Sequence, residues 1–410
     1  MRRENIRQRE SKDFMEARDE LSFSLFSCRI FMKRQLIPWM LFSLLAIVLP
    51  NGSGQAWAPA KSGPDTAIPD AGLENLFCRK SGWIGGDGVF SVPLNDGRIL
   101  WLFGDTLIGN IREGRRPKKT EMINNTIAFQ RRTGVMPKDL EFFFPIRKGK
   151  AASVFVPPNK KGWFWPFHGV QTSSGLYIFL VQIEKTDDPS VFGFHTIGSW
   201  LVRIPNPLEK PQNWRMIYSR IPWSDCTQNM NLFWGSAVLS HGDDLYVYGI
   251  REPLGQKTTV KSMIVAKIPT STLDVFRNWT FYSRGTWGKD FRKVEDLFPK
   301  CASEFSVTFD SNMKRFLALY SSQEGFSRDI LIRSAPKPWG PWSEPQKIYT
   351  CPGFEKNPNM LFYAAKHHPE LSRTNELVIS YATNSLNFED LFSDAALYFP
   401  KFVRIFFSPG

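Results

Sequence analysis

Two aspartates frame one short segment of the chain, and their spacing could bring two carboxyl groups together. Asp87 precedes the apolar run VFSVPL, Asp105 follows the run ILWLFG, and an Asn-Asp-Gly turn separates the two runs. If residues 85–109 fold as an antiparallel hairpin, the two outer ends meet at one edge of the sheet. We therefore expect Asp87 and Asp105 to lie side by side, where paired carboxyl groups could take part in acid–base chemistry.

Other residues capable of proton transfer or polar binding lie far from this segment. Glu304 precedes Phe305, and apolar neighbours raise the pKa of a carboxyl group. Imidazoles stand in WPFHG, as His168, and in AAKHHPEL, as His367 and His368. An aromatic ring, a guanidinium group and two amides complete the candidate set: Trp234, Arg251, Asn125 and Asn384. A common site requires a fold that brings these distant positions together.

A degenerate repeat supplies such a fold. Five segments share a polar or glycine turn followed by an apolar run in β-favouring residues, at residues 97–104, 175–182, 243–250, 314–321 and 375–382. Their starts are separated by 78, 68, 71 and 61 residues. Each run is long enough for a strand and too short for a typical helix.

A second candidate strand precedes each of these runs, which predicts five hairpins. The preceding strands are expected at residues 86–94, 167–173, 234–240, 303–310 and 363–371. The remaining residues of each period leave room for two outer strands, so the unit matches a four-stranded blade. We predict an all-β fold, a single-domain five-bladed β-propeller, with one short helix near residues 274–277.

A propeller would place the candidate residues in one ring, because the innermost strand of every blade runs along the central channel. The starts of these strands carry Asp87, His168, Trp234, Glu304, and His367 or His368. The ends of the second strands return to the same face and add Asp105, Gln182, Arg251 and Asn384. A ring of carboxyl groups, imidazoles, amides and one aromatic ring suits a sugar better than a hydrophobic ligand.

Cleavage of a glycosidic bond needs two carboxyl groups, one protonated and one ionised. We expect Asp87 to be the ionised partner, Glu304 the acid, and Asp105 a supporting residue of the same catalytic set. The structural alternatives are a turn-forming Asp87, a solvent-exposed Glu304 at a strand end, and an Asp105 that holds its own loop.

Substrate binding is predicted for His168, Trp234, Arg251, His367, His368, Asn125 and Asn384. Each has a structural alternative: the histidines could be buried residues with satisfied hydrogen bonds, Trp234 a core residue, and Arg251 an ordinary ion-pair partner. Asn124 and Asn125 also form part of a glycosylation sequon. No cofactor is expected, and no ligand spacing supports calcium near the histidines.

The composition excludes several classes of protein. Aromatic residues make up 14% of the 410 residues and charged residues only 22%, which indicates a globular protein with a large core. The formal net charge is +13, but the basic residues are scattered, so nucleic acid is not an expected partner. The expected partner is a polysaccharide or oligosaccharide.

The N-terminal region has the layout of a secretory signal. Residues 32–60 combine a basic start, an apolar run and small residues, and the run is too short to span a membrane. We expect residues 1–31 to be a non-native or disordered extension, 32–60 a signal peptide, 61–71 a leader and 72–410 the propeller, in a secreted or periplasmic protein without a stable membrane span. Export would leave Cys78, Cys226, Cys301 and Cys351 as thiols or disulfides, with three possible pairings.

Several motifs resemble domain-of-unknown-function family 4185, which is related to five-bladed glycoside hydrolases such as arabinanases, xylosidases and levanases. They are GGDGVFSVPL with LWLFGDTLIG, MINNTIAF, FWGSAVL, SEFSVTFD with PWGPWSEPQKIY, and HHPEL with ELVISYATNS. The resemblance spans residues 80–405 and implies a five-bladed propeller with acidic residues at the channel mouth. Asp87 matches the family's acidic position in the first blade, and some members degrade D-arabinan.

The sequence therefore predicts a secreted glycoside hydrolase that acts on an extracellular polysaccharide, with a furanoside such as arabinan as a candidate substrate. A non-catalytic, lectin-like propeller that holds a glycan in the same ring is the alternative. A scaffold that displays loops to another protein is a third hypothesis.

Overall fold

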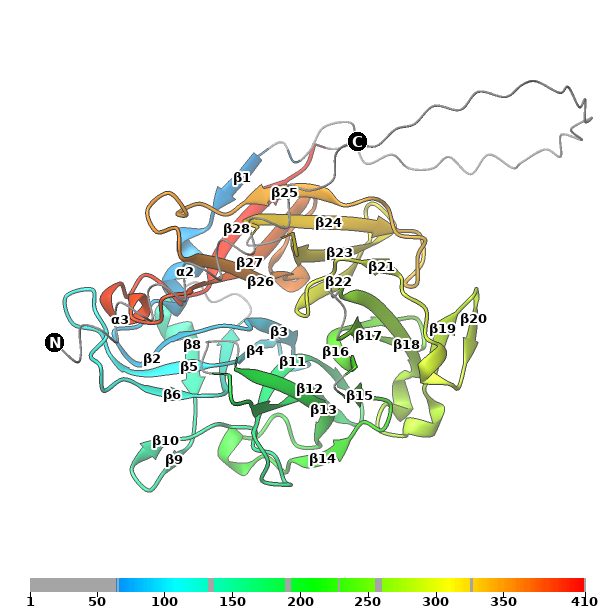
Figure 1. Cartoon of the computed structure of the whole chain (residues 1–410), viewed down its shortest axis with the longest axis horizontal. Coiled ribbons are helices and arrows are strands. Elements are labelled where there is room, and N and C mark those ends of the chain that lie inside the picture. Colours follow the sequence, from blue (N-terminus) through cyan, green and yellow to red (C-terminus); the bar gives the residue numbers. More distant parts are fainter. Residues whose placement is uncertain are drawn as a thin grey trace, which may run out of the picture. The chain divides into compact units, whose positions relative to one another are not determined.

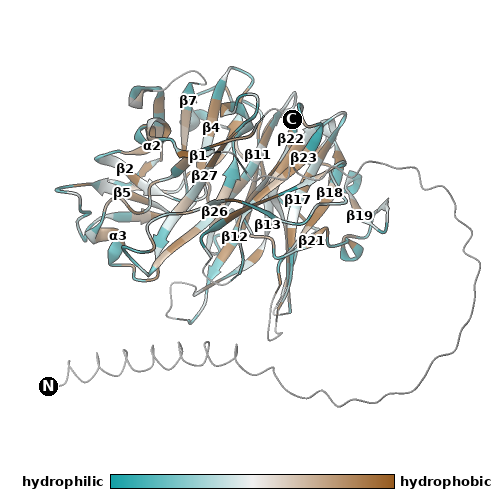
Figure 2. Cartoon of the chain, turned by 90° about the horizontal axis from the view of Figure 1, so that it is seen from above, coloured by the Kyte–Doolittle hydropathy of each residue, from teal (hydrophilic) through white to brown (hydrophobic). Residues whose placement is uncertain are grey.

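The computed structural model describes residue 64 and residues 66–131, 136–188, 193–227, 229–254, 260–324 and 327–408. The expected N-terminal extension and signal peptide, residues 1–60, lie outside these ranges. Residues 58–410 form one compact unit, and most of its described part is β-sheet (Figure 1). Hydrophobic residues concentrate in the strands, whereas many connecting loops are hydrophilic (Figure 2).

Among the described residues, five sheets contain four or more strands. The first contains β3 (Phe90–Pro93), β4 (Arg98–Phe103), β7 (Thr126–Arg131) and β8 (Leu140–Phe143). The second contains β11 (Trp163–Thr172), β12 (Gly175–Lys185), β13 (Phe194–Ile204) and β14 (Ile217–Arg220). The fourth contains β22 (Phe305–Asp310), β23 (Arg315–Ser321), β24 (Asp329–Ala335) and β25 (Gln346–Thr350).

The third and fifth sheets depart from this simple four-strand pattern. The third contains β15 (Asp225–Cys226), β16 (Met230–His241), β17 (Asp244–Pro253), β18 (Ser262–Pro269), β19 (Thr280–Ser283), β20 (Thr286–Gly288) and β21 (Phe298–Pro299). The fifth contains β26 (Met360–His367), β27 (Glu376–Ser385), β28 (Lys401–Phe406) and β1 (Thr66–Pro69). The fifth sheet thus joins both ends of the folded unit.

Smaller elements fill the connections. A three-stranded sheet contains β2 (Ser81–Gly86), β5 (Thr106–Asn110) and β6 (Glu121–Ile123), and β9 (Ile146–Arg147) pairs with β10 (Lys150–Ala151). The helices are α2 (Ala71–Phe77), α3 (Asp390–Ser393) and the 3-10 turns η1 (Pro137–Asp139), η2 (Pro211–Asn213), η3 (Thr270–Thr272), η4 (Phe276–Asn278), η5 (Phe291–Lys293) and η6 (Pro369–Leu371).

The predicted hairpins are confirmed. The pairs β3–β4, β11–β12, β16–β17, β22–β23 and β26–β27 are all antiparallel. In β12 the run from Gly175 to Ile183 is buried throughout, since both faces of the strand are covered. Burial on both faces explains why these strands are continuous apolar runs without alternation.

One strand of each sheet lies beside its counterparts at the centre of the unit. β11 contacts β3 and β16, β16 contacts β22, and β22 contacts β26. Ser91 Oγ in β3 lies 2.6 Å from Nδ1 of His368, which follows β26, and this contact closes the series. Residues from all five strands or their ends line one cavity of about 480 Å³.

Bulges interrupt three of these central strands, at register shifts in β11, β16 and β26. In the β26 bulge, Ala365 N donates to Ser321 Oγ at 3.1 Å. Two other backbone groups of these strands bond to side chains of neighbouring strands: Val238 N donates to His168 Nδ1 at 2.9 Å, and His367 N donates to Ser306 Oγ at 2.8 Å. These bonds link the central strands and satisfy their backbone donors.

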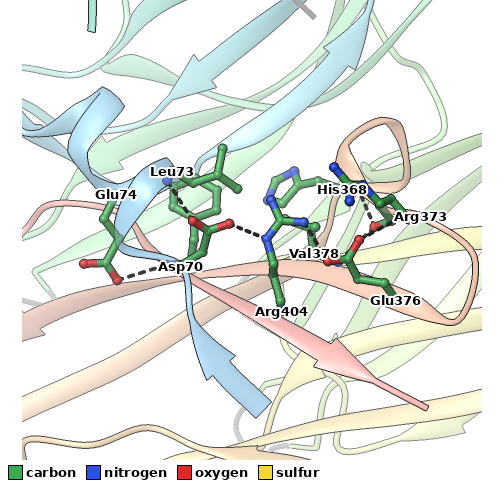
Figure 3. A network of polar contacts seen from close by, with 10 residues as sticks. Asp70, Leu73, Glu74, His368, Arg373, Glu376, Val378 and Arg404 are labelled. Carbon is green, nitrogen blue, oxygen red and sulfur yellow. Dashed lines mark hydrogen bonds and ion pairs between the residues drawn. The ribbon is translucent and has the colours of Figure 1, made fainter. Parts of the chain in front are cut away.

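Within the segment expected to be a leader, residues 61–71, residues 66–69 form β1 and pair with β28. Asp70 then caps α2 by accepting from Leu73 N at 3.0 Å. Arg404 of β28 donates to Asp70 at 2.5 Å and to Glu376 at 2.6 Å (Figure 3). The start of the described chain is therefore built into the last sheet.

Two further expectations concern the helices and the cysteines. The helix expected near residues 274–277 corresponds to η4, whereas α2 was missed because seven residues are too few for a visible helical period. All four cysteines of the described chain are free. Within the same described ranges, none of the helices combines the length and the apolar character needed to cross a membrane.

Candidate active site

Asp87 lies directly after β2 and is fixed through backbone and side chain. Gly104 N donates to Asp87 O at 3.0 Å, and Asp87 N lies 3.4 Å from Asp105 O, so the two aspartates share one edge of the hairpin as predicted. Asp87 Oδ2 accepts hydrogen bonds from the hydroxyls of Tyr363, at 2.7 Å, and Tyr398, at 3.0 Å. Two tyrosines from the C-terminal part of the chain thus orient this carboxyl group.

Gly104 leaves the space that Asp87 occupies. A Cβ atom added to Gly104 would lie 2.5 Å from Asp87 Oδ1, far inside a normal contact distance. Gly104, the glycine of the FGDT motif, is therefore needed because a larger residue would occupy the space of the Asp87 carboxyl group. This requirement is independent of backbone strain, because it arises from the close approach of the carboxyl group.

Asp105 is held by the second sheet. Its Oδ1 accepts from Trp165 Nε1 at 2.9 Å and from Asn124 Nδ2 at 3.2 Å. Burial raises the pKa of Asp105 to about 6, although both hydrogen bonds act in the opposite direction. Asp105 is therefore tied to β11 and supports the site from one side.

Glu304 stands immediately before β22 and faces a buried ammonium group. Lys366 Nζ, on β26, lies 3.3 Å from Glu304 Oε1, donates to Ala364 O at 2.9 Å, and lies 4.1 Å from the centroid of the Phe90 ring. The Lys366 side chain is 2% exposed and that of Glu304 22%. Burial lowers the pKa of Lys366, and the charge of Glu304 opposes this shift.

The three carboxyl groups interact. The pKa of Asp87 is raised to about 8, chiefly by burial and also by the negative charges of Asp105 and Glu304, whereas the hydrogen bonds from the two tyrosine hydroxyls act in the opposite direction. The raised pKa favours the protonated form of Asp87 near neutral pH, although Asp87 was expected to be the ionised partner. The cation of the cluster, Lys366, lies beside Glu304 instead.

The histidines are placed differently from the carboxyl cluster. His168 Nε2 donates to Ser91 O at 3.2 Å and its Nδ1 accepts from Val238 N. His367 lies 2.9 Å from Thr308 Oγ1 and 3.0 Å from Ser372 Oγ. Burial lowers the pKa of both rings, to about 4 and about 3 respectively. Both residues link central strands with ring nitrogens that are already hydrogen-bonded.

His368 has the same structural role. Its Nδ1 lies 2.6 Å from Ser91 Oγ and its Nε2 lies 2.7 Å from Ser380 Oγ. Burial lowers the pKa of this ring well below its usual value. The ring nitrogens of the three histidines thus hold neighbouring strands together, and the three residues also line the central cavity.

Trp234 and Asn125 are core residues rather than parts of a sugar site. Trp234 is fully buried and donates from Nε1 to Trp223 O at 2.9 Å. Asn125 is also fully buried, and its amide bonds the backbone of Phe155 and Phe164. Burial excludes the stacking surface expected of Trp234 and the lining role expected of Asn125.

Arg251 and Asn384 lie at strand ends, as predicted, with different partners. Arg251 pairs with Asp296 at 2.7 Å and donates to Val294 O at 3.2 Å, which matches the ion-pair alternative. Asn384 Nδ2 lies 3.4 Å from the Tyr363 hydroxyl and so contacts the residue that orients Asp87. Of these two, only Asn384 joins the described carboxyl cluster.

Four residues of the cluster were missed at the sequence level: Tyr363, Lys366, Tyr398 and Trp165. Tyr363 and Lys366 lie in the predicted first strand of the fifth hairpin, and Trp165 lies three residues before His168, so blade position could have pointed to them. Asn124 belongs to the Asn124–Asn125 pair that the sequence offered as a possible lining of the site. Tyr398 carries no comparable signal, because it lies in an irregular segment between β27 and β28.

Metal ligands do not gather anywhere in the described ranges. No group of three or more His, Cys, Asp or Glu side chains there is arranged to hold a metal ion.

Comparison with known families gives one match over most of the chain. A family model described as "Domain of unknown function (DUF5005)" matches residues 70–407. This model differs from family 4185, which the sequence motifs suggested. No curated protein sequence matches the chain.

A solved structure shares the fold. A Bacteroides ovatus protein named as a candidate hydrolase aligns at 24% identity with a TM-score of 0.68, covering 85% of this chain and 93% of its own. Weaker similarity links the chain to a GH43_1 enzyme from Xanthomonas citri, at 14% identity and TM-score 0.44, covering 81% and 92% of the two chains. An endo-arabinase from Bacteroides thetaiotaomicron aligns at 10% identity and TM-score 0.44, covering 81% and 99%.

Proposed function

We propose that this chain, which belongs to the DUF5005 family of domains of unknown function, is a five-bladed β-propeller that hydrolyses glycosidic bonds. The observation that carries the proposal is the convergence of Asp87, Asp105 and Glu304, from the first and fourth sheets, in one interacting cluster. Two carboxyl groups in different protonation states are what glycosidic cleavage requires. The hydrolase name of the Bacteroides ovatus protein agrees with this proposal.

The two catalytic roles follow from the surroundings of the carboxyl groups. Asp87, whose pKa is raised to about 8, holds a proton that it can donate to the leaving oxygen. Glu304, held beside the Lys366 ammonium, is the ionised partner that attacks the sugar or activates water. Asp105 keeps a negative charge near Asp87 and so helps Asp87 to retain its proton.

The substrate class follows from the predicted export of the chain and the polar character of the cluster. We propose an extracellular polysaccharide or oligosaccharide as substrate, with a furanoside such as arabinan as the first compound to test. The proposed location is secreted or periplasmic, on the basis of the signal-like residues 32–60.

Release of reducing ends from a panel of polysaccharides tests the activity. Asp87→Asn and Glu304→Gln should each lower the rate by about 10²- to 10⁴-fold. The matched controls are Asp243→Asn and Glu344→Gln, which change exposed carboxyl groups and should keep the wild-type rate. Full activity in either site variant would remove that residue from the mechanism. Glycan binding without new reducing ends would favour a lectin instead.

The roles of the two residues need a separate experiment. If Asp87 is the acid, Asp87→Asn should keep most of its activity on aryl glycosides whose leaving groups need no protonation. Glu304→Ala should be inactive on the same compounds, and added azide should restore turnover by replacing the missing carboxylate. The opposite pattern would return the acid role to Glu304.

A further inference from the structure

Arg116 is a buried arginine whose partners are backbone carbonyl groups. Its side chain is 2% exposed and lies in the connection between β5 and β6. Both Nε and Nη2 donate to Ile84 O, at 3.0 and 2.8 Å. The other acceptors lie near the C-terminus of the chain. Nη1 donates to Leu391 O at 2.7 Å, and Nη2 donates to Ala395 O at 3.1 Å and to Leu397 O at 2.8 Å. Burial lowers the pKa of Arg116 to about 10.

These carbonyl groups belong to two segments that meet at Asp87. Ile84 lies in β2, which ends one residue before Asp87. The other acceptors lie in the segment between β27 and β28, which contains α3 and leads directly into Tyr398. Arg116 N also donates to Phe392 O at 2.9 Å, so the backbone of the arginine holds the same segment.

Tyr398 completes the connection to the carboxyl group. Gly86 N donates to Tyr398 O at 2.8 Å, and the Tyr398 hydroxyl donates to Asp87 Oδ2 at 3.0 Å. Tyr398 has a φ of 68°, a conformation that a non-glycine residue adopts only when its surroundings hold it there. Arg116 is therefore connected to Asp87 by its hydrogen bond to Leu397 O, by the next residue along the chain, Tyr398, and by the hydrogen bond from the Tyr398 hydroxyl.

We infer that Arg116 is a positioning residue for Asp87: it ties the segment that carries Tyr398 to β2 and thereby keeps the Tyr398 hydroxyl on the carboxyl group. The catalytic consequence rests on the proposed function, whereas the effect on the Asp87 carboxyl group does not.

Lysine cannot replace this arginine. A guanidinium group presents five N–H donors in a fixed plane, which allows one side chain to serve carbonyl groups from two segments. An ammonium group offers three donors around one point and cannot span the same acceptors. Arg116→Lys therefore keeps the positive charge while it removes the geometry that fixes Tyr398.

The direction of the effect on Asp87 follows from its surroundings. Asp87 is under the influence of the charges of Asp105, Glu304 and Lys366 and accepts from the hydroxyls of Tyr363 and Tyr398. A hydroxyl that donates to a carboxylate favours its ionised form, so loss of the Tyr398 hydroxyl raises the pKa of Asp87. Displacement of the hydroxyl through Arg116 acts in the same direction.

The experiment measures the titration of Asp87 directly in the folded protein. Aspartate-selective ¹³C NMR assigns the Asp87 carboxyl carbon by its absence in Asp87→Asn, and the pH midpoint is followed in Tyr398→Phe, Arg116→Lys and the double variant. Each single variant should raise the midpoint by about one pH unit, and the double variant should add nothing beyond the larger single effect. Arg115→Lys, at the exposed neighbouring position, should titrate like the wild type.

Several results would overturn the inference. If the titration midpoint of Asp87 rises in Tyr398→Phe but not in Arg116→Lys, Arg116 does not position the Tyr398 hydroxyl. If the shifts of the two single variants add fully in the double variant, the two residues act independently. If Arg116→Lys lacks the wild-type circular dichroism, Arg116→Gln replaces it, and failure of both to fold would make Arg116 a residue of fold stability alone. Because no substrate is used, a protein without glycosidase activity still tests the positioning role.

Discussion

The ammonium group of Lys366 lies 3.3 Å from a carboxyl oxygen of Glu304, and it is the cation of an ion pair whose lysine is almost fully buried. The two residues come from β26 and from the start of β22, on neighbouring sheets. Ion pairs such as Lys118–Glu389 and Lys300–Glu324 lie at the surface, where they contribute little. The buried pair instead places a cation beside one carboxyl group of the candidate site.

Lys366→Met should lower kcat/KM, because the variant leaves the Glu304 carboxyl group of the candidate site without its cationic partner. Lys366→Arg keeps the positive charge and should keep more of the activity. The control is Lys300→Met, which breaks an exposed pair with Glu324 and should leave kcat/KM unchanged. Wild-type kcat/KM in Lys366→Met would contradict this role.

Gly104→Ala should disable the site without removing the fold. The added methyl group would meet Asp87 Oδ1 at 2.5 Å, so the carboxyl group must move, and misplacement of about 1 Å typically lowers a rate by about 10²-fold. Urea denaturation should show that the variant still unfolds cooperatively. Gly288→Ala is the matched control, since nothing lies within 4 Å of its added Cβ atom. Wild-type kcat/KM in Gly104→Ala would show that Asp87 does not need its observed position.

The raised pKa of Asp87 should make stability depend on pH. An aspartate in the unfolded chain ionises near pH 3.9, whereas the folded group keeps its proton to about pH 8. Below about pH 3.9 this carboxyl group is protonated in both the folded and the unfolded chain, and it does not lower the free energy of unfolding. As the pH rises from there to about 8, only the unfolded chain ionises, so the free energy of unfolding falls. Asp87→Asn removes the dependence, so above about pH 6 the variant should be more stable than the wild type, by on the order of a few kcal/mol at pH 8.

Urea unfolding of wild type and Asp87→Asn between pH 4 and 9 measures this difference. The free energy of unfolding of the wild type should fall relative to that of the variant across the interval. Parallel curves would mean that Asp87 titrates alike in the folded and unfolded chain, and the assigned acid role would then lose its electrostatic basis.

His368→Ala should weaken the junction between the fifth and first sheets. The variant removes a buried ring and leaves the hydroxyls of Ser91 and Ser380 without their partner, which should lower the free energy of unfolding by about 2–4 kcal/mol. His195→Ala, at an exposed position, should change it by less than about 0.5 kcal/mol. A loss of sugar binding without a loss of stability would instead restore the ligand role first expected of His368.

The hairpins could be predicted because their information is local. The second strand of each hairpin is buried over most of its length, so its residues form a continuous apolar run, and a glycine or polar turn separates it from its partner. The edge shared by Asp87 and Asp105 follows from antiparallel pairing alone. The proximity of Glu304 could be inferred because equivalent positions of a repeated hairpin face the same side.

The chemical state of each candidate could not be predicted in this way, since it depends on residues that other segments supply. The three channel histidines have the right chemistry for ligand binding, but Ser91, Thr308 and residues of neighbouring strands occupy their nitrogens. Trp234 had a suitable ring for stacking, yet the packing of the third sheet buries it completely.

The repeat in the sequence thus determined the sheets and the edge at which the carboxyl groups meet, because strand pairing depends on short-range apolar patterns. Only the tertiary structure decided the surroundings of each carboxyl group. Tyr398 reaches Asp87 across 311 residues of chain, and Lys366 reaches Glu304 from another sheet. Burial and neighbouring charge control a pKa, and both arise only when these separate segments come together.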